Sequence, residues 1–186
     1  MPIALRRWLG AAAILAITAC ARPNAAANFT LRDDGGVPWT LASQHGSVVL
    51  LTFGFTHCAD TCPTTLAKLV HLATPLRRAG GKPIEIAFVT VDPQRDTPAA
   101  LHRFVSRFST STVPVVGLTG TPAQIDAVEN AYHVWAQRIP GRHGVSYDEA
   151  HTASIFFIDA GGAIRSLHDD DDPNRVLARA IREAAS

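Results

Sequence analysis

The run from Val48 to Phe53 is the feature that most limits how this chain can fold. It reads Val-Val-Leu-Leu-Thr-Phe, so its apolar character is interrupted only at Thr52. A short, continuous run of apolar and β-branched residues is typical of a strand that is buried on both faces. The rest of the domain therefore has to cover this strand from both sides.

Strand-like and helix-like segments alternate along the rest of the chain. Two short segments on either side of Asp33-Asp34-Gly35-Gly36 predict a hairpin near the start of the domain. Further strands are predicted at 84–91, 113–118, 152–158 and 163–167, and helices are predicted to begin near Pro63, Pro98, Pro122 and Pro173. This order predicts an α/β fold, a three-layer sandwich in which a sheet lies between two layers of helices.

The N-terminus has the pattern of a secretion signal. Arg6 and Arg7 precede an apolar stretch, residues 8–19, which is shorter than the roughly 20 apolar residues needed to cross a bilayer. The next residue is Cys20, and the sequence Ile-Thr-Ala-Cys that ends there resembles a bacterial lipobox. An ordinary cleaved signal or an uncleaved anchor are the alternatives, and all three place the domain outside the cytoplasm.

We expect three parts in this chain. Residues 1–19 form a lipoprotein-type signal peptide, residues 20–28 a tether lipidated at Cys20, and residues 29–186 the folded domain. The lipid would hold the domain at the periplasmic face of the inner membrane of a bacterial cell envelope. Cleavage leaves 15 basic against 16 acidic residues, a net charge of −1. No basic patch is visible, so nucleic acid is not an expected partner.

Cys58 and Cys62 are the residues that point most directly to chemistry. With Pro63 at the first helical position, Cys62 would cap the helix and Cys58 would lie in the preceding loop. Residues four apart on a helix have Cβ atoms about 5–6 Å apart, whereas a disulfide needs about 3.5–4.5 Å. The spacing therefore favours a metal held between the sulfurs, although the loop position of Cys58 also allows a reversible disulfide.

Two thiolates rarely complete a metal site alone, and the eight histidines are the candidates for a third ligand. His151 is favoured because it directly precedes the apolar strand 152–158, whose start commonly lies beside a strand-to-helix loop in a sandwich of this kind. His57 adjoins Cys58, but a side chain there would usually point away from the sulfur. Structural or surface positions are expected for the remaining histidines, which are His45, His71, His102, His133, His143 and His168.

Two thiolates and one imidazole make a soft site that suits Cu(I), Cu(II) or Zn(II). No further cysteine remains in the folded domain to close a four-ligand structural zinc site. An open site of three ligands suits an ion that must leave again. The residues therefore favour a metal carrier over a structural zinc module.

Several stretches of the chain resemble the Sco/SenC copper chaperones. They read Phe-Gly-Phe-Thr-His-Cys at 53–58, Cys-Pro-Thr-Thr-Leu at 62–66, Thr-Val-Asp-Pro-Gln-Arg-Asp-Thr-Pro at 90–98, Gly-Leu-Thr-Gly-Thr at 117–121 and His-Thr-Ala at 151–153. The resemblance covers roughly residues 28–185. It implies a thioredoxin-like, copper-binding domain in which Cys58, Cys62 and His151 hold the copper. It also implies a role in assembling the dinuclear copper site of a respiratory cytochrome c oxidase.

The chain departs from the family pattern at two places. Ala59-Asp60-Thr61 stands where members often have Pro-Asp-Val, and Ala150 stands where they often have aspartate directly before the histidine. An acidic neighbour can orient a ligand imidazole. Either copper affinity is lower here, or Glu149 takes over that contact.

Two further groups of charged residues have alternative interpretations. Asp92, Arg95 and Asp96 either serve recognition of a partner or, as we favour, cap the following helix and pair with one another. The acidic run 169–172 is expected to be a solvated turn rather than a cation site.

The resemblance implies that copper is delivered to the copper-bearing subunit of cytochrome c oxidase from a domain held at the membrane by its lipid anchor. A periplasmic thiol reductant would keep Cys58 and Cys62 reduced. The alternative is a thiol–disulfide oxidoreductase that uses the same pair to reduce the cysteines of that subunit. His151 discriminates between the two because exchange needs only the thiols. A peroxidase and a purely structural lipoprotein are weaker alternatives.

Overall fold

A seven-stranded sheet forms the middle of the computed structural model, which describes residues 24–141 and 147–186. The strand order is β2-β1-β5-β4-β3-β8-β9, and β6 and β7 form a separate two-stranded sheet. The strands are β1 (Thr30–Asp33), β2 (Pro38–Thr40), β3 (Val48–Gly54), β4 (Ile84–Thr90), β5 (Val115–Thr119), β6 (Ala136–Pro140), β7 (Tyr147–His151), β8 (Ser154–Ile158) and β9 (Ile164–Asp169). The helices are α1 (Thr61–Arg78), α2 (Pro98–Val105), α3 (Pro122–Ala131) and α4 (Asn174–Ala185), with a 3-10 turn, η1 (Leu41–Gln44).

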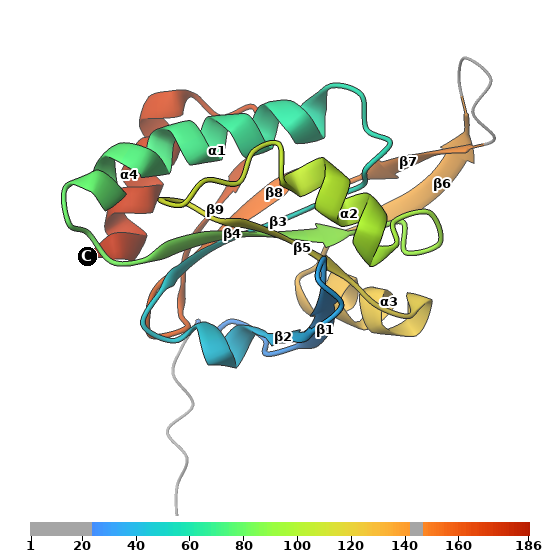
Figure 1. The fold of residues 1–186 in the computed structure, drawn as a ribbon, viewed down its shortest axis with the longest axis horizontal. Helices are drawn as coiled ribbons and strands as arrows, with labels where there is room; N and C mark the ends of the chain where they lie inside the picture. Colours follow the sequence, from blue (N-terminus) through green and yellow to red (C-terminus); the bar gives the residue numbers. More distant parts are fainter. Residues whose placement is uncertain (1–23, 142–146) are drawn as a thin grey trace, which may run out of the picture.

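Helices cover both faces of the main sheet, with α1, α2 and α4 on one face and α3 on the other (Figure 1). Strand β3 alternates between the two cores. Val48 and Leu50 belong to the core beneath α1, α2 and α4, whereas Val49 and Leu51 belong to the core on the α3 side. The run from Val48 to Phe53 is therefore buried on both faces, and the predicted three-layer α/β sandwich is confirmed.

Strand directions bring three loops to one edge of the sheet. β3 runs parallel to β4, and Gly54 at the end of β3 lies opposite Thr90 at the end of β4. β8 runs antiparallel to β3, with Ile155 opposite Thr52. The loop after β3, the loop after β4 and the segment before β8 therefore meet at the same edge.

Two boundaries near this edge differ from the sequence predictions. α1 begins at Thr61 with Asp60 as its cap, so Cys62 lies inside the first turn rather than at the cap. Proline is tolerated at the following position because the first N–H groups of a helix have no intrahelical acceptor. His151 is the last residue of β7, not the residue directly before β8, which begins at Ser154.

The β6–β7 hairpin was not predicted at all. The sequence predicts an irregular stretch before residue 152, whereas two short and mostly polar strands lie there. Their burial is also mixed, with Glu149 the only residue of the two strands that is buried. Pairing between the strands, such as Ala136 opposite His151, comes from contacts that periodicity does not reveal.

The end of the predicted tether runs along the domain. Ala25 pairs with Ala163, and the N–H of Ala26 donates to the carbonyl of Gly162 at 2.9 Å. The predicted signal peptide, residues 1–19, and Cys20 lie outside the described residues. Among the residues that are described, no helix has the length and apolar character to span a membrane.

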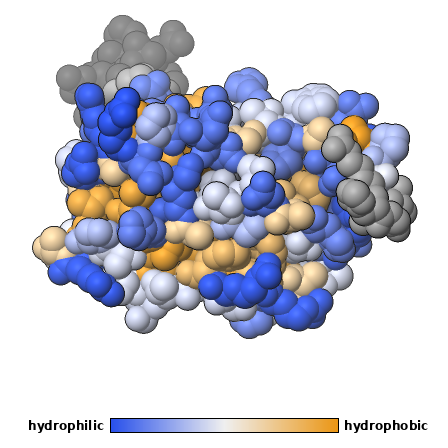
Figure 2. All heavy atoms as spheres, turned by 90° about the horizontal axis from the view of Figure 1, so that it is seen from above, coloured by the Kyte–Doolittle hydropathy of each residue, from blue (hydrophilic) through white to orange (hydrophobic). Residues whose placement is uncertain are grey.

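The helical face of the molecule carries a mixed surface (Figure 2). Hydrophilic residues lie between hydrophobic ones on the side seen there, which carries α1, α2 and α4. The described large apolar residues that stay exposed are Val37, Trp135 and Leu167.

Candidate metal centre

Cys58 and Cys62 lie where β3 passes into α1. The backbone turns after β3 as the N–H of Cys58 donates to the carbonyl of Phe55 at 3.2 Å, and the Phe55 ring is buried beneath the loop. Cys62 follows in the first turn of α1 and is 4% exposed, whereas Cys58 is only half-buried. One sulfur is therefore accessible from solvent and the other is enclosed.

Gly54 makes room for the enclosed sulfur. A Cβ atom at this position would lie 2.7 Å from the Cys62 sulfur and 2.6 Å from Cε2 of Phe88. Both distances are far shorter than van der Waals contact, so any side chain here would displace the ring or the sulfur. Close approach of Cys62 to the sheet thus explains the glycine between two phenylalanines in the sequence.

The two thiols are not joined in a disulfide, and their pKa values differ. The N–H of Cys62 donates to the sulfur of Cys58 at 3.3 Å. Hydrogen bonds from the Cys62 thiol, then from the backbone of Cys62 and Asp60, lower the pKa of Cys58 to about 6, with a smaller electrostatic contribution from His151 and against the effect of burial. The bond to Cys58 and burial raise the pKa of Cys62 well above the ordinary thiol value. At neutral pH the pair therefore holds one thiolate, on Cys58.

We predict that Cys58 is alkylated far faster than Cys62 in the reduced, metal-free chain. The rate at Cys58 should rise with pH about a midpoint near 6, because only the thiolate attacks and the pKa of this thiol is lowered to about 6. Peptide mapping after short treatment with iodoacetamide at pH values from about 4 to about 9 measures both rates. Equal rates at the two cysteines would contradict the prediction.

His151 presents one ring nitrogen to the cysteine side. Its Nδ1 lies 3.0 Å from the carbonyl oxygen of Thr152. A carbonyl can only accept, so the proton of the neutral ring is on Nδ1 and the lone pair is on Nε2. The ring also packs edge-on against Phe55, with 5.9 Å between centroids. These two contacts define the orientation of the ring and leave Nε2 free to bind a metal.

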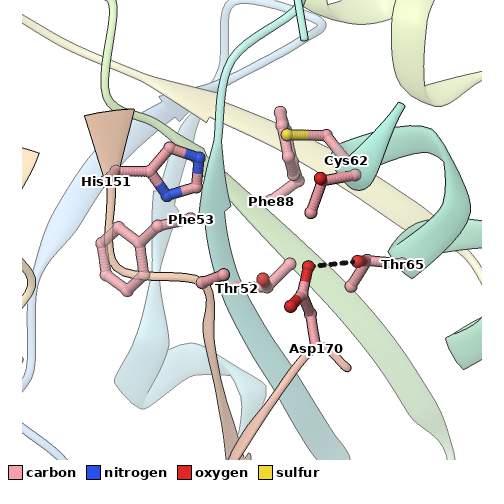
Figure 3. Close-up of a pocket in the computed structure, with 9 residues that line it drawn as sticks. Thr52, Phe53, Cys62, Thr65, Phe88, His151 and Asp170 are labelled. Carbon is pink, nitrogen blue, oxygen red and sulfur yellow. Dashed lines mark hydrogen bonds between the residues drawn. The ribbon is translucent and has the colours of Figure 1, made fainter. Parts of the chain in front are cut away.

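The three predicted ligands line adjoining cavities. Cys58 and His151 share a groove of about 610 Å³, and Cys62 and His151 share a smaller pocket of about 10 Å³ with Asp170. The ring of His151 and the sulfur of Cys62 face each other across that pocket (Figure 3). Within the described ranges no three histidine, cysteine or carboxylate side chains are close enough to hold an ion together. Sharing one metal would require the ring and the two sulfurs to draw closer, so their role as ligands stays a prediction.

Comparison with known proteins identifies the family of the chain. A family model described as SCO1/SenC matches residues 18–186. The chain belongs to the SCO1/SenC family. It is 38% identical over 136 residues to the protein SCO2 homolog, mitochondrial, of Bos taurus, which corresponds to 73% of this chain and 50% of that protein.

A second curated relative matches a larger share of this SCO1/SenC chain. The protein SCO2 homolog, mitochondrial, of Homo sapiens is 35% identical over 167 residues, or 86% of this chain and 62% of the human protein. The chain thus spans about half to three fifths of the length of these curated relatives.

Solved structures of Sco proteins share the fold. The crystal structure of Arabidopsis thaliana ScoI with copper bound has a TM-score of 0.75 at 27% identity and covers 85% of this chain and 96% of that one. Bradyrhizobium japonicum ScoI with copper bound has a TM-score of 0.70 at 30% identity and covers 86% and 99%. Yeast Sco1 has a TM-score of 0.75 at 28% identity and covers 87% and 97%. The predicted thioredoxin-like fold and the Sco/SenC resemblance are confirmed.

The family departure at Ala150 has a structural consequence. Glu149 does not take the place of the missing aspartate, because its buried carboxylate accepts from Nε of Arg138 at 3.2 Å. The Thr152 carbonyl contacts Nδ1 of His151 instead. A neutral carbonyl polarises the imidazole less than a carboxylate does, so we expect Nε2 of His151 to be a weaker donor than in a site where a carboxylate accepts from Nδ1.

Three other histidines in the described residues contact groups outside the candidate ligand set. His57 is exposed, with its Nδ1 3.3 Å from the Thr56 hydroxyl. His102 pairs with Asp34 at 2.7 Å, and His168 pairs with Asp172 at 2.8 Å. His143 lies outside the described residues.

The acidic run 169–172 forms the predicted turn, in which Asp169 and Asp171 are exposed, but Asp170 also contacts α1. Asp170 is half-buried, its carboxylate accepts from the Thr65 hydroxyl at 3.1 Å, and its carbonyl accepts from Lys68. These bonds tie the end of β9 to α1, and Figure 3 shows the Asp170–Thr65 bond at the foot of the pocket. The run adjoins the candidate site, and no sequence signal distinguished it from an ordinary acidic turn.

Trp135 is the other residue that sequence reasoning missed. It is 55% exposed and lines the groove with Cys58 and His151. Its backbone N–H and carbonyl pair with Thr152, next to the candidate ligand. An isolated exposed tryptophan in a segment interpreted as irregular offered no signal of this position.

Proposed function

We propose that this chain is a copper chaperone that binds copper through Cys58, Cys62 and His151 and delivers it to the dinuclear copper site of a respiratory cytochrome c oxidase. Membership of the SCO1/SenC family and the copper-bound Sco neighbours support the choice of metal and of recipient. The observation that carries the proposal is the free Nε2 of His151, which shares cavities with both sulfurs.

The donor set suits this cargo. Thiolates are soft ligands that favour Cu(I), and one imidazole completes a three-ligand site. Cys58 already carries the negative charge, so only the Cys62 proton has to leave when the metal binds. The groove stays open on the Cys58 side, which would let a recipient's ligands replace the chaperone's ligands one at a time.

We further propose that residues 1–19 are a lipoprotein signal and that Cys20 carries the lipid. The domain would then work at the periplasmic face of the inner membrane of a bacterial cell envelope. In that oxidising compartment Cys58 and Cys62 would form a disulfide, and the metal site would lose both thiolate ligands. A periplasmic dithiol reductant would supply the two electrons and two protons that restore the thiols, and would itself become a disulfide.

The second candidate is a thiol–disulfide oxidoreductase that reduces the cysteines of the oxidase's copper-bearing subunit. One observation favours it: the more accessible cysteine, Cys58, has the lowered pKa, and its partner Cys62 is enclosed behind it. An accessible thiolate that attacks and an enclosed thiol that resolves the mixed disulfide are the two parts such an enzyme needs.

Copper titration of the whole chain tests the leading proposal. With the thiols reduced, we expect one Cu(I) per chain in competition with a Cu(I) chelator. After oxidation of the pair to a disulfide, we expect no competitive binding, because two of three ligands are gone. Retention of one copper per chain by the disulfide form would rule out the proposed ligand set.

A further inference from the structure

Two buried carboxylates occupy the loop between β4 and α2, next to the candidate metal centre. The side chains of Asp92 and Asp96 are both fully buried. Such burial excludes the direct partner recognition considered from the sequence. It also carries a desolvation cost, which must be offset by hydrogen bonds or ion pairs. The partners of each carboxylate therefore indicate what it does.

Asp96 contacts the loop that carries the cysteines. Its carboxylate accepts from the Thr56 N–H at 3.0 Å and from the Thr56 hydroxyl at 2.6 Å. It also accepts from the hydroxyl of Thr90, the last residue of β4, at 2.6 Å. Thr56 lies two residues before Cys58, so Asp96 attaches the cysteine loop to the end of β4.

Asp92 contacts the hairpin that carries His151. One carboxylate oxygen accepts from the Tyr147 hydroxyl at 2.9 Å and lies 3.7 Å from Nη2 of Arg138. The other oxygen pairs with Arg95, whose Nη1 donates to the Tyr147 carbonyl at 3.0 Å. The two guanidinium groups also lie over the Tyr147 ring, at 3.7 Å for Arg95 and 4.5 Å for Arg138.

The hairpin needs such an attachment. β6 and β7 form their own two-stranded sheet, which projects beyond the main sheet (Figure 1). An isolated two-stranded hairpin is at best marginally stable in water. Alternate residues of a strand share a face, so Tyr147, Glu149 and His151 lie on one face of β7. The contact of Asp92 with Tyr147 and the contact of Arg138 with Glu149 hold this face of the strand in place. They therefore also set the orientation of His151 relative to the cysteines.

We propose that Asp92 and Asp96 are positioning residues that hold the two halves of the metal site in register, Asp96 through the cysteine loop and Asp92 through the β6–β7 hairpin. The inference rests on the proposed function, in that Cys58, Cys62 and His151 are taken as the ligands. Neither carboxylate contacts the metal. Four residues apart on one loop, they link two segments that are 91 residues apart in the sequence, the separation of Thr56 and Tyr147.

A double-mutant cycle with His151 tests the role of Asp92. Asp92→Ala should weaken Cu(I) binding about 10- to 100-fold, as is typical when an outer contact of a metal site is lost. In a His151→Ala chain the same substitution should have little further effect, because the hairpin no longer supplies a ligand. Asp96→Ala should weaken binding in both backgrounds, because the cysteine loop is used in each. Affinity is measured by competition with a Cu(I) chelator under reducing conditions.

Milder variants and a matched control accompany the cycle. Tyr147→Phe removes the hydroxyl contact with Asp92, and Thr56→Val removes the hydroxyl contacts with Asp96 and with the exposed His57. Both should show the same patterns with smaller losses. They decide the question if the alanine variants do not fold. Glu85→Ala is the control, because Glu85 accepts from the Trp39 indole near the other end of β4 and touches neither half of the site. It should leave copper affinity unchanged.

Hydrogen exchange of the reduced, metal-free chain gives a readout that does not depend on copper. Asp96→Ala should speed exchange mainly in residues 55–62, and Asp92→Ala mainly in residues 147–152. The proposal is overturned if both variants bind copper like the unmodified chain. It is also overturned if Asp92→Ala lowers copper affinity by the same factor in the His151→Ala chain as in the unmodified chain. If instead the Cys58→Ser/Cys62→Ser chain keeps its copper, the proposed function fails. The hydrogen-exchange patterns of the two aspartate variants would still test the positioning role.

Discussion

A chain with both Cys58→Ser and Cys62→Ser is expected to lose competitive copper binding altogether. Structural metal sites with four ligands bind with about 10–16 kcal/mol, so each ligand is worth roughly 3 kcal/mol. Loss of both thiolates should then lower affinity on the order of 10⁴-fold, since 1.4 kcal/mol corresponds to tenfold. Serine has nearly the same shape as cysteine, so the enclosed position under Gly54 should remain filled. Competition with a Cu(I) chelator measures the change.

The matched control for this variant is Cys20→Ser, which removes a thiol and leaves the pair at 58 and 62 intact. Its copper affinity in solution should equal that of the unmodified chain. Undiminished, one-to-one binding by the double variant would show that the copper site lies elsewhere and would end the proposal.

His151→Ala separates the two candidate functions. The variant should bind Cu(I) on the order of 10²-fold more weakly, because it loses one ligand of three at roughly 3 kcal/mol. Thiol–disulfide exchange by Cys58 and Cys62 should continue at a rate within about a few-fold of the original, because His151 is the smallest of the influences that lower the pKa of Cys58. Copper competition and reduction of a small disulfide substrate measure the two activities on the same samples.

His57→Ala is the control for this experiment. His57 also lines the groove and directly precedes Cys58, but it is exposed, and its Nδ1 lies 3.3 Å from the Thr56 hydroxyl and 4.0 Å from the Asp96 carboxylate. Its removal should weaken copper binding far less than the removal of His151 does. Equal losses in the His57 and His151 variants would contradict the assignment of His151. Oxidase assembly that survives His151→Ala in cells would favour the oxidoreductase.

Much of the fold could be predicted because its signals are local. Val48 to Phe53 is apolar except at Thr52. Proline stands at or next to the start of α2, α3 and α4, and glycine follows the end of α1. Pro98 and Pro122 are each preceded by a threonine that caps the helix, as the structure bears out. The β6–β7 hairpin could not be predicted, since its polar strands are stabilised by Asp92 and Arg95 from a distant loop.

The sequence by itself determined the layered α/β architecture, the family, and the choice of Cys58, Cys62 and His151 as candidate ligands, because periodicity and motif spacing lie within short stretches of chain. Only the tertiary structure decided which sulfur is accessible, which nitrogen of His151 is free, and that Asp92 and Asp96 are enclosed between the two halves of the site. Exposure, proton position and ion pairing depend on neighbours from distant segments, and those neighbours are brought together only when β3, β4 and β8 end at the same edge of the sheet.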